Sequence, residues 1–273
     1  MEQYIQYIGI SLAIISIIYD IIVFISFIKT KNSKNHLKIY QLHILIFSVI
    51  NSIYIILYQI HRLEPKLDCK LIVFIQDYSF MPLLTTALCI CIINLLIIRG
   101  DSCLIMQKVK MNIGMTLLIW LLPAIRIGFV VYLILKDNLQ FFHDECLIQN
   151  YMYSMIYYAH IAVHYLGIFI ICLIIIAKLC KIKSNLMIYS HKPLICKMVM
   201  YILMLFLFAS IDILTNITRE FKDDTFVRSL FLSGTPLMNI FLVYTFNWNQ
   251  KVKESCYNMC FGKQSKEYFN DEF

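Results

Sequence analysis

The sequence predicts an all-α membrane protein, a seven-transmembrane helix bundle with its N-terminus outside the cell and its C-terminus inside. Of its 273 residues, 60% are hydrophobic and only 15% are charged, whereas a soluble domain carries about 25% charged residues. The apolar residues form long runs, and the basic residues that give the net charge of +7 lie between them. This pattern suits a protein that faces anionic lipid and argues against a nucleic-acid partner.

Seven apolar runs are each long enough to span a bilayer as a helix, which needs about 20 residues. Helices are the open-chain structure that satisfies backbone hydrogen bonds in hydrocarbon. Residues 1–247 are therefore expected to form the membrane domain, and residues 248–273 an amphipathic eighth helix with a short cytoplasmic tail. The runs are Ile5–Ile28, Tyr40–Ile60, Leu71–Ile98, Ile113–Leu135, Tyr151–Ala177, Leu194–Ile217 and Phe226–Phe246.

The third run is the one around which we expect the others to be organised. It follows Cys69, ends at Arg99, and contains a single interior charge, Asp77, with Pro82 just beyond. As a helix it would be roughly 40 Å long, enough to cross a bilayer with some tilt.

The distribution of Lys and Arg predicts the orientation. With the N-terminus outside, most of these residues lie in the segments that face the cytoplasm, including a Lys-rich segment from Lys178 to Lys197. Positive residues concentrate on the inner side of membrane proteins. We therefore expect the N-terminus outside and the C-terminus inside.

This orientation separates the ten cysteines into two groups. Only Cys69 and Cys146 lie on the oxidising side, one at the outer end of the third helix and the other in the loop between helices four and five. A disulfide between them would hold that loop over the bundle. Two unrelated free thiols are the alternative.

Several features together resemble G-protein-coupled receptors. These are the seven helices, the cysteine pair, Trp120 in the fourth helix and the exit of the seventh helix, where Pro236-Leu237-Met238-Asn239 is followed by Val243-Tyr244-Thr245-Phe246-Asn247. The exit is similar to that of cAMP-receptor-like and secretin-like receptors. The Asp-Arg-Tyr and Asn-Pro-x-x-Tyr motifs of the rhodopsin family are absent, which argues against that branch.

The resemblance implies coupling to a heterotrimeric G protein at the inner face. It assigns inner-face roles to Arg99, Asn239 and Tyr244, although Arg99 also fits a simple positive-inside anchor. It further implies a plasma-membrane protein that is not an enzyme and uses no cofactor. The Lys-rich segment would be a contact surface for the G protein.

Ionisable side chains inside a membrane are costly and usually face the bundle or a wet cavity. Four of them lie at similar outer depth on helices three to six, which suggests one pocket for a small extracellular ligand. Arg126 would be the counter-ion of an anionic or zwitterionic ligand, with Asp77 as its resting partner. The alternative is a structural pair of Arg126 with Asp77 or Asp212. The four candidates are Asp77, Arg126, His160 and Asp212.

Two rival functions remain open. His160 and His164 share a helix face and could hold a metal, as in a seven-helix metal-dependent membrane hydrolase, but the last helix contains no histidine. A small-solute transporter is the second alternative. Asp20 and Asn239 could also meet across helices one and seven as a polar lock in the inner half, with two separately satisfied groups as the alternative.

The residues after Phe246 predict an interfacial helix on the inner leaflet. Val252, Cys256 and Cys260 recur at four-residue spacing on one face. Cys256 and Cys260 are therefore palmitoylation candidates, with two reduced cytosolic thiols as the alternative.

Overall fold

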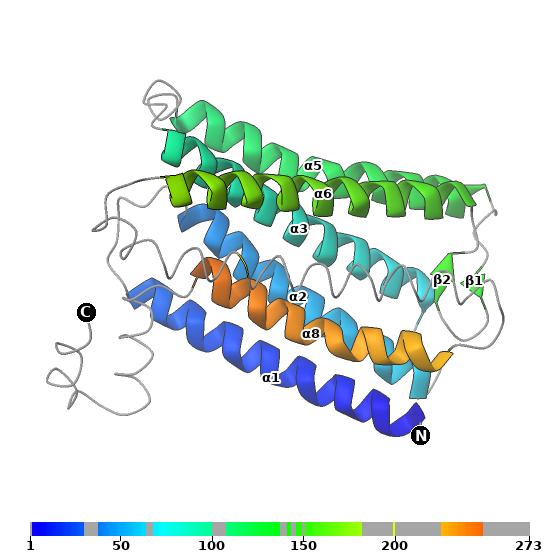
Figure 1. Ribbon diagram of the computed structural model, residues 1–273. Helices are drawn as coiled ribbons and strands as arrows, with labels where there is room; N and C mark the ends of the chain where they lie inside the picture. Colours follow the sequence, from blue (N-terminus) through cyan, green and yellow to red (C-terminus); the bar gives the residue numbers. More distant parts are fainter. Residues whose placement is uncertain are drawn as a thin grey trace, which may run out of the picture.

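The computed structural model describes residues 2–29, 38–63, 68–99, 108–136, 141–142, 146–148, 151–181, 199 and 225–247. These residues form six long helices and one short hairpin (Figure 1). The elements are α1 (Glu2–Lys29), α2 (Lys38–Leu63), α3 (Cys69–Arg99), α5 (Lys108–Leu135), β1 (Phe141–Phe142), β2 (Leu147–Ile148), α6 (Tyr151–Lys181) and α8 (Thr225–Asn247).

Five of these helices, α1, α2, α3, α5 and α6, are long and apolar enough to cross a membrane. The chain is therefore an all-helical protein with the architecture of a multi-pass membrane protein. The seventh predicted run corresponds to α8. The sixth predicted run, Leu194–Ile217, lies outside the described residues apart from Val199, so the count of seven helices stays a prediction.

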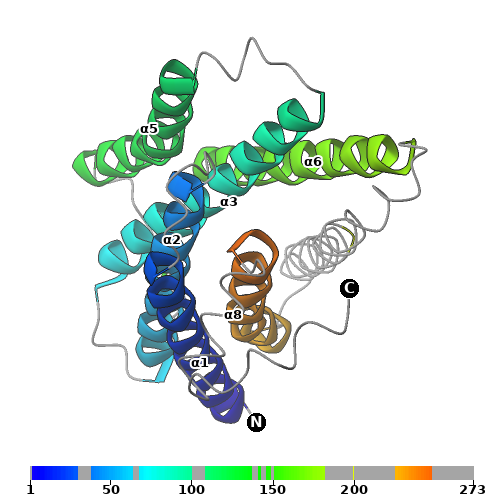
Figure 2. The same ribbon diagram turned by 90° about the vertical axis from the view of Figure 1, so that its left-hand side faces the viewer.

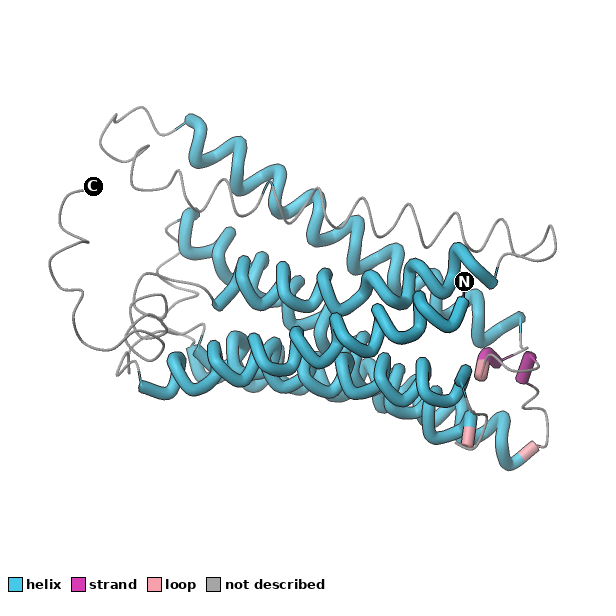
Figure 3. Tube along the Cα trace, turned by 90° about the horizontal axis from the view of Figure 1, so that it is seen from below, coloured by secondary structure: helices cyan, strands magenta, loops and turns pink. Residues whose placement is uncertain are grey.

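The helices lie along one common direction, with the hairpin at the end of the bundle where α1 begins (Figures 1 and 3). We call this the hairpin end. The other end carries basic residues at the helix termini, and we call it the basic end. Lysine and arginine residues at this end include Lys29, Lys38, Arg99, Lys108 and Lys181.

α3 is the central helix of the described bundle. It packs against α2, α5 and α6 and also touches α8, while α1 packs against α2 and α8 (Figure 2). The segment from Met81 to Ala87 is buried at every position. The position of α3 in the middle confirms the organising role that its sequence predicted.

The outward faces are apolar. Ile125 on α5 is 69% exposed and Val163 on α6 is 66% exposed. Large exposed patches of this kind are rare on soluble monomers. On helices of this length they are the surface that lipid would cover.

The predicted disulfide between Cys69 and Cys146 is present, with their Cα atoms 4.7 Å apart. Cys146 lies beside β2 in a left-handed backbone conformation, with φ of 45°. The two strands are antiparallel, with Phe141 opposite Ile148 and Phe142 opposite Leu147. The disulfide therefore ties this hairpin to the first residue of α3.

Candidate ligand site

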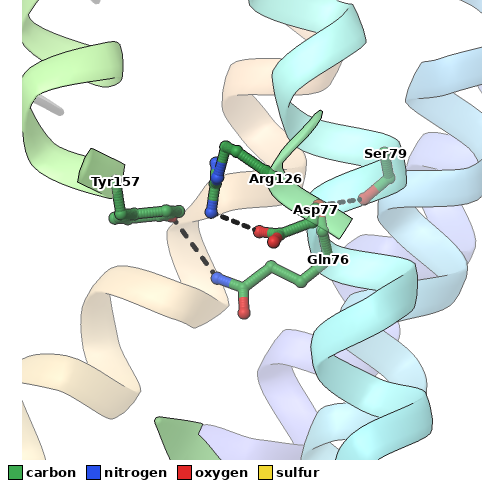
Figure 4. Close-up of polar contacts among 5 residues, drawn as sticks. All are labelled: Gln76, Asp77, Ser79, Arg126 and Tyr157. Atoms are coloured by element: carbon green, nitrogen blue, oxygen red, sulfur yellow. Dashed lines mark hydrogen bonds and ion pairs between the residues drawn. The ribbon is translucent and has the colours of Figure 1, made fainter. Parts of the chain in front are cut away.

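A buried ion pair joins α3 to α5. Arg126 Nη2 donates to Asp77 Oδ1 at 2.6 Å, and the two side chains are only 3% and 1% exposed (Figure 4). A charge isolated in the membrane interior is strongly unfavourable, and pairing offsets this. The sequence left Asp77 and Asp212 open as partners of Arg126. The structure shows the pair with Asp77, and Asp212 lies outside the described residues.

Tyr157 of α6 covers the guanidinium of Arg126. The Arg126 Cζ atom lies 4.6 Å from the centre of the Tyr157 ring, a cation–π distance. Gln76, next to Asp77, donates from Nε2 to the Tyr157 hydroxyl at 3.4 Å (Figure 4). The site therefore combines side chains of α3, α5 and α6.

The ion pair belongs to the hairpin end of α3. Asp77 is eight residues beyond Cys69, so it lies about 12 Å along the helix from the disulfide. Arg99, at the other end of α3, is almost three times as far away along the chain.

His160 extends this site on α6. It lies about one turn after Tyr157 on the same helix. Its ring stacks on that of His164 with centroids 4.5 Å apart. The His160 Nε2 atom is buried and has no hydrogen-bond partner among the described residues. His160 therefore retains a ring nitrogen with hydrogen-bonding capacity among the described residues.

His164 is held by the protein through both ring nitrogens. Its Nδ1 contacts the carbonyl oxygen of His160 at 2.8 Å, and its Nε2 contacts Thr85 Oγ1 at 3.0 Å. A metal ligand needs a free ring nitrogen. His164 thus connects α6 to α3 through Thr85, and both of its ring nitrogens are occupied by protein contacts.

Of the other predicted functional residues, the structure describes the side chains of Asn239 and Tyr244, and these differ in burial. Asn239 is 1% exposed, in the core, whereas Tyr244 is 41% exposed. Arg99 is the last residue of α3, and its side chain is outside the described part. Asp212, Cys256 and Cys260 lie outside the described residues.

A second polar region, not predicted as a unit, joins α1, α2, α3 and α8. Asn51 Nδ2 donates to Asn239 Oδ1 at 3.1 Å, and Asn239 Nδ2 donates to Ser52 Oγ at 3.2 Å. Ser79 donates to Asn51 Oδ1 at 3.2 Å, and Ser52 donates to Ser16 at 3.1 Å. We call these five residues the asparagine–serine network.

The predicted polar lock between Asp20 and Asn239 is wrong. Asp20 Oδ2 accepts a hydrogen bond from Ser48 at 2.6 Å, and Asn239 instead meets Asn51 and Ser52. Both residues of the supposed lock therefore bond to α2, which packs against both α1 and α8 although these two helices also contact each other directly.

The chain matches no protein-family model, and no curated protein is significantly similar to it. Its function must therefore be argued from its own residues.

Proposed function

We propose that this protein is a seven-transmembrane receptor that transmits the binding of a small extracellular ligand to a cytoplasmic heterotrimeric G protein. The observation that carries the proposal is the buried Asp77–Arg126 pair, which lies beside the central helix, at the hairpin end, under Tyr157. The resemblance of the sequence to cAMP-receptor-like and secretin-like receptors supports the same reading.

Two independent features support an outward-facing hairpin end. More basic residues lie at the helix termini of the opposite end than at the hairpin end, where Arg62, Lys70 and Lys136 lie, as the positive-inside rule requires of a cytoplasmic side. The Cys69–Cys146 disulfide lies at the hairpin end, and disulfides persist in oxidising compartments. The plasma membrane is the proposed location, and the Leu194–Ile217 run supplies the seventh proposed span.

The ion pair offers a physical mechanism for the switch. A ligand carboxylate that replaced Asp77 at Arg126 would exchange an α3–α5 bond for a ligand–α5 bond. Such a ligand would bind the state in which Asp77 and Arg126 are apart more tightly than the state in which they are paired. This difference in affinity is what a population shift requires. His160, with an available ring nitrogen, would contact a further polar group of the ligand.

Movement of α3 would reach the basic end directly. This helix packs against α2, α5 and α6 and runs without interruption from Cys69 to Arg99. A shift at Asp77 therefore acts on a helix whose far end lies at the proposed cytoplasmic face. There Arg99, Tyr244 and the Lys178–Lys197 segment form the proposed contact surface for the G protein.

The test is guanine-nucleotide exchange on a panel of purified heterotrimeric G proteins, with the full chain in lipid nanodiscs. We expect exchange above that of empty nanodiscs with at least one G protein, and an increase with small carboxylates or zwitterions. The Arg126→Gln variant should lose the ligand-dependent increase. His43→Gln, a substitution of an α2 histidine packed on Phe47 and Trp120, is the matched control that should keep it.

No exchange with any G protein would contradict the proposal. Proteoliposomes that accumulate the same small anions would then favour the transporter. Ligand-dependent exchange that is unchanged in Arg126→Gln would keep the receptor but remove Arg126 from its ligand site.

A further inference from the structure

A histidine lies against the disulfide at the hairpin end. His61 of α2 is 5% exposed, and its Nε2 atom is 3.7 Å from Cys69 Sγ. A ring nitrogen of His61 and the Sγ atoms of Cys69 and Cys146 all lie within 4.8 Å of one another. Three potential ligands of a soft metal therefore converge from α2, α3 and the hairpin.

The spacing of these atoms fits zinc. Tetrahedral zinc binds sulfur at about 2.3 Å and imidazole nitrogen at about 2.0–2.1 Å, which places a sulfur and a nitrogen ligand about 3.6 Å apart. The observed distance from His61 Nε2 to Cys69 Sγ is 3.7 Å. The two bonded sulfur atoms would have to separate to about 3.8 Å, and Cys146 Sγ, which now lies within 4.8 Å of a His61 ring nitrogen, would have to lie about 3.6 Å from it.

We propose that reduction of the Cys69–Cys146 disulfide creates a zinc site formed by Cys69, Cys146 and His61, with water as the fourth ligand. This inference does not depend on the proposed receptor function. A dithiol reductant supplies two electrons and two protons, so that the disulfide becomes two thiols and the reductant becomes a disulfide. Zn²⁺ then displaces the two thiol protons, and His61 Nε2 donates its lone pair.

The surroundings permit this rearrangement. Neither cysteine lies in the middle of a helix: Cys69 is the half-buried first residue of α3, and Cys146 lies next to β2, where it is 2% exposed and packs with Ile72. His61 Nδ1 has no hydrogen-bond partner among the described residues. Among the described residues, no hydrogen bond at Nδ1 therefore holds His61 in the tautomer with its proton on Nε2, in which Nε2 could not bind zinc.

The consequence is that zinc replaces a covalent bond as the connection between the hairpin and α3. In the oxidised protein the sulfurs form the disulfide and offer no thiolate. In the reduced protein zinc keeps the hairpin near the outer end of α3. Zinc binding thus depends on the redox state of this one pair.

The test uses the full chain in lipid nanodiscs, reduced with a phosphine that is then removed, and titrated with Co²⁺ as a spectroscopic substitute for zinc. We expect one tetrahedral Co²⁺ per protein with sulfur-to-cobalt charge-transfer absorption, and none in the oxidised protein. His61→Ala should weaken binding by more than about tenfold. His43→Ala, on the same helix, is the matched control and should not change it.

A second measurement excludes the buried thiols Cys89, Cys91 and Cys172 and does not need a variant. Zinc should protect Cys69 and Cys146 of the reduced protein from alkylation, as mapped by peptide mass, and a chelator should remove the protection. Absence of Co²⁺ binding to the reduced protein, equal affinity in His61→Ala, or unprotected Cys69 and Cys146 would each overturn the zinc site.

Discussion

Two polar regions in the described core satisfy their buried polar side chains in different ways. On the α5 and α6 side, one full charge pair, Asp77–Arg126, is covered by Tyr157. On the α1 and α8 side, the asparagine–serine network connects four helices through neutral hydrogen bonds of 3.1–3.2 Å. Both regions are almost fully buried and both have a partner on α3.

The difference lies in what happens when one member is removed. A buried charge without its partner costs about 3–5 kcal/mol. A neutral hydrogen bond between membrane helices is worth on average about 0.6 kcal/mol. Removing one member of the ion pair is therefore expected to cost several times more than removing one member of the network. This contrast makes the ion pair the better candidate for a switch and the network the better candidate for a fixed joint.

The largest expected effect is that of Arg126→Met, which removes the cation that faces Asp77. We expect a loss of about 3–5 kcal/mol, measured as a fall in thermal stability in nanodiscs. Adding Asp77→Asn should restore most of it, because a buried pair replaced by neutral groups is often tolerated. If the double variant is as unstable as the single one, the pair does not act as a unit.

The next effect concerns the α1–α8 contact beside the network. A Cβ atom added at Gly9 would lie 2.8 Å from Ser233 Oγ and 3.0 Å from Gln59 Nε2. We expect Gly9→Ala to destabilise by about 1–3 kcal/mol through overpacking, measured by thermal unfolding. Gly114→Ala is the matched control, since an added Cβ there meets nothing within 4 Å. Equal behaviour of the two variants would show that α1 does not pack as described.

A smaller effect is expected for Asn239→Leu, which removes two hydrogen bonds of the network. The loss should be about 1 kcal/mol, read from the same unfolding measurement. Asn51→Leu and Asn239→Leu combined should lose less than the sum of the singles, because both remove one shared bond. Full additivity would mean that Asn51 and Asn239 do not interact.

The smallest effect is expected for Tyr157→Phe, which removes the hydroxyl that accepts from Gln76 but keeps the ring under Arg126. Stability should fall by less than about 0.5 kcal/mol. Tyr157→Leu should fall further, by about 1–2 kcal/mol, because the cation–π contact is lost. Equal losses in the two variants would assign the role of Tyr157 to its hydroxyl rather than its ring.

The sequence predicted the helices of the described part well and underestimated their lengths. The structure extends the predicted run Leu71–Ile98 to the helix Cys69–Arg99, and the predicted run Ile5–Ile28 to the helix Glu2–Lys29. The apolar pattern marks the part of a helix that lies in hydrocarbon. The helical backbone continues beyond it into the interface, where polar residues are equally favourable.

The charged site could be predicted because charges are rare in apolar runs. Asp77 and Arg126 stand out as single ionisable residues, and each needs a partner. Tyr157 could not be chosen among 18 tyrosines. Its position one turn before His160, on the same helix face, was the only available signal.

The asparagine–serine network could not be predicted for a related reason. Serine and asparagine are common in membrane helices, and their partners depend on how helices rotate against one another. The predicted Asp20–Asn239 contact was wrong for this reason, because the sequence does not reveal how α1 and α8 are rotated about their axes relative to α2. Lone charges narrow the choice of partner, whereas neutral polar residues do not.

The most direct test of the account is the sidedness of the hairpin end, on which both the proposed ligand entry and the signalling direction depend. Intact cells would be treated with a membrane-impermeant phosphine and then with a membrane-impermeant maleimide, and labelled cysteines mapped by mass. The account predicts label on Cys69 and Cys146 before permeabilisation, and no label without the phosphine. Label on this pair only after permeabilisation would place the hairpin end in the cytoplasm and contradict the account.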